Sequence, residues 1–148
     1  MNRILVASLL LAGGAAHAVL EGRPGDSTAA PAQRSAAATS AGVAYTESVR
    51  TLPSGTVIHE YADGSGTVFA VAWSGPHKPD LKQLLGSHFG AMQDAMAGQP
   101  RERRANRSHM DVSTGDLVVQ SAGHMGAYEG RAWLQSRVPT GFDPQEMK

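Results

Sequence analysis

The feature that most constrains the fold is one apolar run near the middle of the 148-residue chain. Residues 67–73 carry no polar side chain after Thr67, and they lie between the turn-forming residues 63–66 and the pair Gly75-Pro76. A short apolar run with turn residues at both ends is typical of a strand in the middle of a sheet. The chain is therefore expected to fold around a β-sheet that has residues 67–73 as an inner strand.

Other segments alternate apolar and polar residues and are separated by turn residues, which is the pattern of antiparallel strands. Pro53-Ser54-Gly55 suits a type I turn with a bulge, and the Asp-Gly-Ser-Gly sequence of residues 63–66 is a strong hairpin signal. The expected strands are residues 45–52, 56–62, 67–73, 111–113, 116–121 and 128–137.

The loop between the second and third strands decides which side chains share a face of the sheet. A two-residue loop at residues 64–65 pairs Ile58 with Val71, and we expect this loop. Its register defines a bulky face of Phe69, Val71 and Trp73 and an opposite face of His59, Tyr61, Ala70 and Ala72. A three-residue loop would exchange the two faces, because a shift of one residue turns every side chain over.

Residues 81–97 show the spacing of an amphipathic helix that begins after Asp80. Asp80 is a favourable N-cap, and Gln83 stands where a capping box has its second member. The apolar stripe consists of Leu81, Leu84, Leu85, His88, Phe89, Met92 and Met96, and Gly98 with Pro100 ends it. We expect this helix to pack on the bulky face of the sheet. The shared core would contain Phe69, Val71, Trp73, Leu85, Phe89 and Met92.

Together these patterns predict an α+β fold in the order β-β-β-α-β-β-β, with five to six antiparallel strands and one helix on one face. Residues 43–139 would form the single domain. Residues 19–42 are rich in Ala, Ser and Pro and carry no aromatic side chain, so we expect a disordered tether there. Residues 140–148 are expected to form a polar tail.

Residues 1–18 have the pattern of a secretory signal peptide. Arg3 gives a positive start, residues 4–12 are almost entirely apolar, and Ala16-His17-Ala18 is a small-x-small cleavage site. Cleavage after Ala18 would release the protein to the periplasm or the exterior. No later apolar run reaches the length of a membrane span, so we expect no transmembrane segment in the mature chain.

Composition excludes several classes of function. The chain has no cysteine, which rules out thiolate-bound metals, c-type haem and iron–sulfur clusters. Its formal net charge of zero does not indicate a nucleic-acid partner. The histidines lack common ligand spacings, and there is no G-x-S-x-G motif. We therefore predict no catalytic residue, no metal site and no cofactor.

One set of turn and strand residues is a candidate binding groove. These are aromatic, basic and turn residues near the start of a helix, and we expect such turns to form a groove with exposed donors. The candidates are Trp73, Gly75, Pro76, His124, Arg131 and Trp133. The alternative is that the tryptophans pack in the core and that the other residues serve the turns.

The sequence favours a non-enzymatic periplasmic or secreted module that binds an unidentified envelope protein or cell-surface component. Two alternatives remain open. One is a small envelope hydrolase that uses His124 with Arg131, and the other is a metal-binding module. An enzyme would need His124 within hydrogen-bond reach of a nucleophile or a carboxylate, whereas a binding module needs only a shared exposed surface.

The same segments resemble an exported bacterial family known only as domain of unknown function 2844. The resemblance is carried, in order, by residues 54–61, 66–76, 79–86, 123–125 and 130–134. Ala122 stands where a second glycine is expected before Gly123-His124-Met125. The likeness implies an exported protein, and it assigns no activity, because the family has none assigned.

Overall fold

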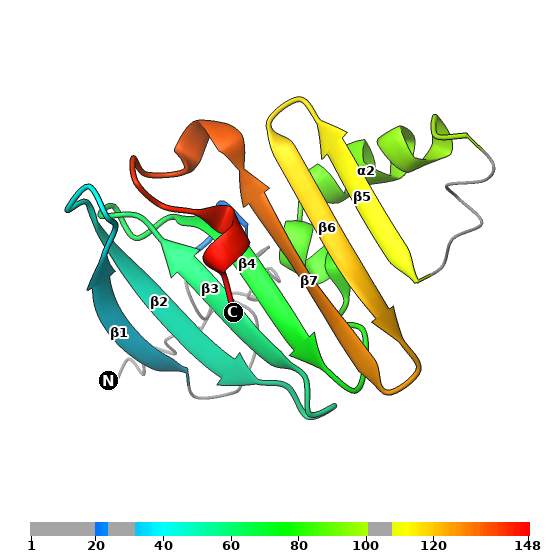
Figure 1. Cartoon of the computed structure of the whole chain (residues 1–148), viewed down its shortest axis with the longest axis horizontal. Helices are drawn as coiled ribbons and strands as arrows, with labels where there is room; N and C mark the ends of the chain where they lie inside the picture. Colours follow the sequence, from blue (N-terminus) through cyan, green and yellow to red (C-terminus); the bar gives the residue numbers. More distant parts are fainter. Residues whose placement is uncertain (1–19, 24–31, 101–107) are drawn as a thin grey trace, which may run out of the picture.

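The computed structural model describes residues 20–23, 32–100 and 108–148 (Figure 1). Within them, seven antiparallel strands form one sheet in the order β1-β2-β3-β4-β7-β6-β5. The strands are β1 Gln33–Ala38, β2 Ala44–Thr51, β3 Val57–Ala62, β4 Val68–Gly75, β5 His109–Thr114, β6 Leu117–His124 and β7 Ala127–Leu134. The helices are α1 Leu81–Leu85 and α2 His88–Ala97, and two 3-10 turns follow, η1 Gln135–Arg137 and η2 Pro144–Glu146.

The α+β class with an antiparallel sheet is confirmed, but two details of the prediction are wrong. The described residues contain seven strands where five to six were expected, and two helices where one was expected. Figure 1 shows both helices behind the sheet and the C-terminal segment crossing in front of it. We call these two sides the helix face and the C-terminal face.

The helix face holds the larger core. Val71 and Trp73 of β4 belong to one cluster with Leu85 and Met92, and the partly buried Phe89 packs against that cluster. These contacts are the ones that the apolar periodicity of the strand and helix predicts. Full burial of one such side chain stabilises the fold by about 1.5–3 kcal/mol, so this layer is a main source of stability.

The β3–β4 hairpin has a longer loop than expected. The N–H of Asp63 donates to the carbonyl of Thr67, and the N–H of Gly66 donates to Asp63, each at 2.9 Å. The loop therefore has three residues, and Gly66 takes the left-handed conformation that it requires, at φ +81°. Such a loop by itself would exchange the two faces of β4.

A β-bulge in β4 reverses that exchange. Tyr61 pairs with Ala70 but the next residue, Ala62, pairs with Val68, so Phe69 is an extra residue that breaks the alternation. The outcome is that Trp73, not Val71, faces Ile58, while His59 pairs with Ala72 on the face that was predicted for it. Phe69 leaves the helix face for a second cluster, so the expectation that it packs against the helices is wrong.

The helical segment is interrupted at Gly86. Asp80 caps α1 as expected, because its carboxylate accepts from the N–H groups of Lys82 and Gln83 at 2.9 and 3.3 Å. Gly86 then adopts φ +54° and ψ −122°, which ends α1 and turns the chain into α2. The low helix propensity of glycine gives the physical reason for two short helices.

Part of the predicted tether belongs to the fold. Residues 33–38 form the edge strand β1, paired with β2 from Gln33–Val49 to Ala38–Ala44. An edge strand can be held by main-chain hydrogen bonds to one neighbouring strand, without large apolar side chains. The short Ala and Ser side chains of β1 form no alternating apolar pattern, so the sequence did not predict this strand. Residues 19 and 24–31 of the predicted tether lie outside the described residues.

Leu20 is a second element of the fold within the predicted tether. Its side chain is 2 % exposed and belongs to the helix-face cluster, and its N–H donates to Leu84 at 3.0 Å. The N–H of Glu21 donates to Val68, and the N–H of Val68 donates to Gly22. The folded unit therefore begins near the expected cleavage site, which itself lies outside the described residues.

The predicted polar tail is also part of the fold. Phe142 packs on the C-terminal face, with ring centroids 4.9, 5.3 and 5.5 Å from those of Phe69, Tyr45 and Tyr61. Thr39 holds the same segment through a 2.8 Å hydrogen bond from its hydroxyl to the carbonyl of Thr140. One aromatic residue among polar neighbours supplies no periodicity, so the sequence pattern did not reveal this contact.

Candidate functional site

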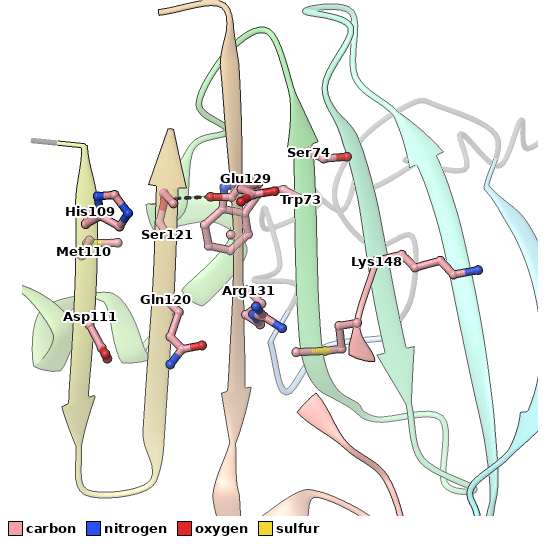
Figure 2. A pocket seen from close by; sticks show the side chains of 13 residues that line it. Trp73, Ser74, His109, Met110, Asp111, Gln120, Ser121, Glu129, Arg131 and Lys148 are labelled. Atoms are coloured by element: carbon pink, nitrogen blue, oxygen red, sulfur yellow. Dashed lines mark hydrogen bonds between the residues drawn. The ribbon is translucent and has the colours of Figure 1, made fainter. Parts of the chain in front are cut away.

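The C-terminal face is hollowed over strands β4, β7, β6 and β5. This hollow has a volume of about 300 Å³ and is bounded by the C-terminal residues Met147 and Lys148. Besides Lys148, its polar lining residues are Ser74, His109, Asp111, Gln120, Ser121, Glu129 and Arg131. We call it the polar trough, and Figure 2 shows its labelled side chains arranged across neighbouring strands.

The register of the sheet explains why these side chains meet. Asp111 pairs with Gln120, Gln120 pairs with Arg131, and Arg131 pairs with Ala72, so one row crosses four strands on one face. Ala72 continues the row with a small side chain, which leaves space beside the long ones. Adjacent strands lie about 4.8 Å apart, so the polar ends of the Asp111, Gln120 and Arg131 side chains lie next to one another.

A second hollow adjoins the trough at the ends of β4 and the β6–β7 hairpin. Its volume is about 620 Å³, and it is lined in part by Gly75, Pro76, His124 and Tyr128. Ser74 and Glu129 line both this hairpin hollow and the polar trough. The two hollows therefore share a boundary.

Five of the six candidate residues line one of these two hollows. Gly75, Pro76 and His124 belong to the hairpin hollow, while Trp73 and Arg131 belong to the polar trough. Trp133 lines neither of them, because it is 8 % exposed in the cluster around Tyr61 and Phe69. The structure thus separates the two tryptophans, which lie on opposite faces of the sheet.

Trp73 is a structural floor for the trough, not an exposed contact residue. Its side chain is 2 % exposed. A Cβ atom built on Gly130 would lie 2.3 Å from the Trp73 ring, so the indole passes directly beneath β7 where that strand has no side chain. The expectation that Trp73 is partly exposed is therefore wrong, and the core alternative describes it correctly.

The polar side chains of the trough make few bonds to one another. Among the described residues, the side chains of Ser74, His109, Asp111, Gln120 and Glu129 form no hydrogen bond or ion pair. Arg131 donates from Nη1 to the carbonyls of Pro144 and Gln145 at 3.2 and 2.7 Å, which fixes its position beside the C-terminal segment. Most of the hydrogen-bonding capacity of the trough is therefore available to a ligand.

The covered part of the same face contains a cluster that the sequence analysis missed. His59 Nδ1 lies 2.7 Å from a carboxylate oxygen of Glu47, and the Tyr61 hydroxyl accepts from the main-chain N–H of Lys148 at 3.3 Å. Burial, with the nearby Glu47 carboxylate, raises the pKa of Tyr61 to about 12. The alternation of Tyr45 and Glu47 in β2 was the available signal, but only the register places Glu47 opposite Tyr61.

This covered cluster borders a third hollow, of about 440 Å³, between β2, β3 and the C-terminal segment. Tyr45, Glu47, Tyr61 and Phe142 contribute to its lining. Its groups are largely engaged with one another, in contrast to those of the polar trough.

The geometry does not bring together the residues of the hydrolase alternative. The His124 ring is hydrogen-bonded through Nδ1 to the carbonyl oxygen of the adjacent Met125, at 3.3 Å. Arg131 is bound to the C-terminal carbonyls, and no nucleophile or carboxylate contacts His124 among the described residues. In the same part of the chain, no group of three His, Asp or Glu residues is placed to hold a metal ion.

The fold and its hollows define a class: a single antiparallel sheet with helices on one face and an open polar trough on the other. The chain belongs to the family described as "Protein of unknown function (DUF2844)", whose family model matches residues 16–147. No curated protein and no solved structure matches the chain. None of the described helices is long and apolar enough to cross a membrane.

Proposed function

We propose that this protein is an exported, non-enzymatic binding module and that the polar trough, with the adjoining hairpin hollow, holds its ligand. The observation that carries the proposal is a hollow in which most of the polar side chains have no hydrogen-bond partner among the described residues. Such concave sites with a few convergent polar groups are the usual form of a binding site. The ligand would be a component of the cell envelope.

Export is part of the proposal, and two observations support it. The signal-peptide pattern ends at Ala18, and Leu20 is already buried in the core. Cleavage after Ala18 would therefore remove the leader without removing a residue of the described fold. N-terminal sequencing of the protein from the envelope fraction tests this point, and a sequence that begins at Met1 would contradict it.

The binding role is tested by capture from a solubilised envelope fraction with the immobilised mature protein. The double variant Asp111→Ala/Gln120→Ala should lose its specific ligand, because both side chains line the trough. Gln93→Ala is the matched control, since Gln93 is an exposed residue of α2 on the other face. Equal capture by the double variant and the wild type would overturn the proposal for this site.

A further inference from the structure

We propose that the ligand of the polar trough is a glycan chain without net charge. This inference rests on the proposed function and names the chemical class of the ligand. Three features of the trough carry it: the main-chain groups of its inner strands are already paired, its side chains offer donors and acceptors together, and it has no excess of cationic groups.

The first feature is the position of the trough on the flat of the sheet. β7 and β6 lie between paired neighbours on both sides, as β4 does, so their main-chain groups are used in the ladders. A peptide that binds by strand addition needs a free edge, and on this side of the sheet that edge is β5, so an added strand would lie beyond the trough and not in it. A ligand on this face meets side chains only, which disfavours an added strand.

The second feature is the mixture of hydrogen-bonding groups. Asp111 and Glu129 offer carboxylate acceptors, Arg131 offers donors, and the amide of Gln120 offers both kinds. Each sugar hydroxyl is itself both a donor and an acceptor. Carboxylate, amide and guanidinium groups are planar and can form two hydrogen bonds side by side. Two neighbouring hydroxyls of a sugar ring can accept or donate such a pair of bonds.

The third feature is charge. The carboxylates of Asp111 and Glu129 and the guanidinium of Arg131 line the trough, and Lys148 lies at its border with its ammonium directed away from them (Figure 2). A surface without an excess of cationic groups has little attraction for polyanions such as nucleic acids or acidic lipids. It suits an uncharged ligand.

The shape of the two hollows fits a chain better than a compact molecule. The polar trough continues at Ser74 and Glu129 into the hairpin hollow, where the half-buried Tyr128 is part of the wall. An aromatic side chain beside polar groups can pack on the apolar face of a sugar ring while the polar groups bind its hydroxyls. A chain could therefore extend from Arg131 to Tyr128.

The experiment measures binding of the mature protein to three solid polysaccharides: peptide-free glycan strands of peptidoglycan, chitin and cellulose. We expect co-sedimentation with at least one of them, with similar affinity in low salt and in 0.5 M salt, about the range where exposed charges are screened. Asp111→Ala and Gln120→Ala should each weaken binding about tenfold, the effect of losing one well-placed hydrogen bond. Gln93→Ala should leave it unchanged.

Three results would overturn the inference. One is that none of the polysaccharides is bound. Another is binding that high salt abolishes, which would indicate a charged polymer. The third is binding that the trough variants do not affect. If no polysaccharide binds while envelope capture still depends on Asp111 and Gln120, the glycan inference fails and the proposed binding function stands.

Discussion

The two halves of the C-terminal face use polar residues in opposite ways. Over β2 and β3, Glu47 bonds to His59, and Tyr61 bonds to the C-terminal main chain. Over β6 and β5, Asp111 and Gln120 point from the sheet without an internal partner, in the hollow that Figure 2 shows. One half of a single sheet face thus stabilises the fold, while the other half leaves much of its hydrogen-bonding capacity unused among the described residues.

The position of the C-terminal segment explains the difference. Phe142 lies over the aromatic rings of the covered half, and polar groups buried beside those rings are stabilised by protein partners because their access to water is reduced. Met147 and Lys148 reach only the border of the polar trough. Polar groups in the trough can bond to water, so they carry no such requirement.

The largest effect should come from removing the cover. Phe142→Ala deletes three aromatic contacts of a partly buried ring, and we expect a loss of about 2–4 kcal/mol in the free energy of unfolding. Denaturant unfolding measures it. Met125→Ala is the control, because Met125 is 91 % exposed and should change stability by less than about 0.5 kcal/mol. Equal stability of Phe142→Ala and the wild type would show that the segment does not cover this half.

The floor of the trough should respond next. Gly130→Ala places a Cβ 2.3 Å from the Trp73 ring and 2.7 Å from the carbonyl oxygen of Gln120, so the ring or the strand must move. Overpacking of this kind costs about 1–3 kcal/mol. We expect a lower melting temperature and a changed Trp73 fluorescence. Gly64→Ala is the matched control, because nothing lies within 4 Å of a Cβ at that position.

A further effect in the covered half depends on pH. The folded pKa of Tyr61 is about 12, above its unfolded value of about 10. The contribution of the neutral Tyr61 phenol to the free energy of unfolding is therefore fully present below pH 10. It decreases as the pH rises from about 10 to about 12. Unfolding measurements across this range should show a decrease in the wild type that is weaker in Tyr61→Phe. The same slope in both proteins would contradict the assignment.

The sequence predicted what depends on long periodic patterns. Val71 and Trp73 pack with Leu85 and Met92 as expected. These contacts were predictable because the alternation of the strand continues over several residues and the apolar spacing of the helical segment over several turns. It misplaced Phe69, since a bulge of one residue is decided by the packing of the whole hairpin. It also missed Leu20 and Phe142, because a single apolar residue in a polar segment has no period.

The residues of the candidate groove come together only in part, for the same reason. Gly75, Pro76 and His124 lie together because they belong to turns at one end of the sheet, which the turn residues indicated. Asp111 and Gln120 were missed, since only the register of β5, β6 and β7 brings them beside Arg131. Trp133 lies apart from the other candidates, because it faces the covered cluster and lines neither the polar trough nor the hairpin hollow.

The smallest effect on stability should come from the trough itself. Asp111→Ala and Gln120→Ala remove side chains that have no internal hydrogen bond, so each should change the free energy of unfolding by less than about 0.5 kcal/mol. Denaturant unfolding of both variants beside Gln93→Ala provides the measurement. A loss above about 1 kcal/mol in either trough variant would mean that the trough, like the covered half, stabilises the fold. Unchanged stability together with lost ligand capture is the result that separates binding from folding on this face.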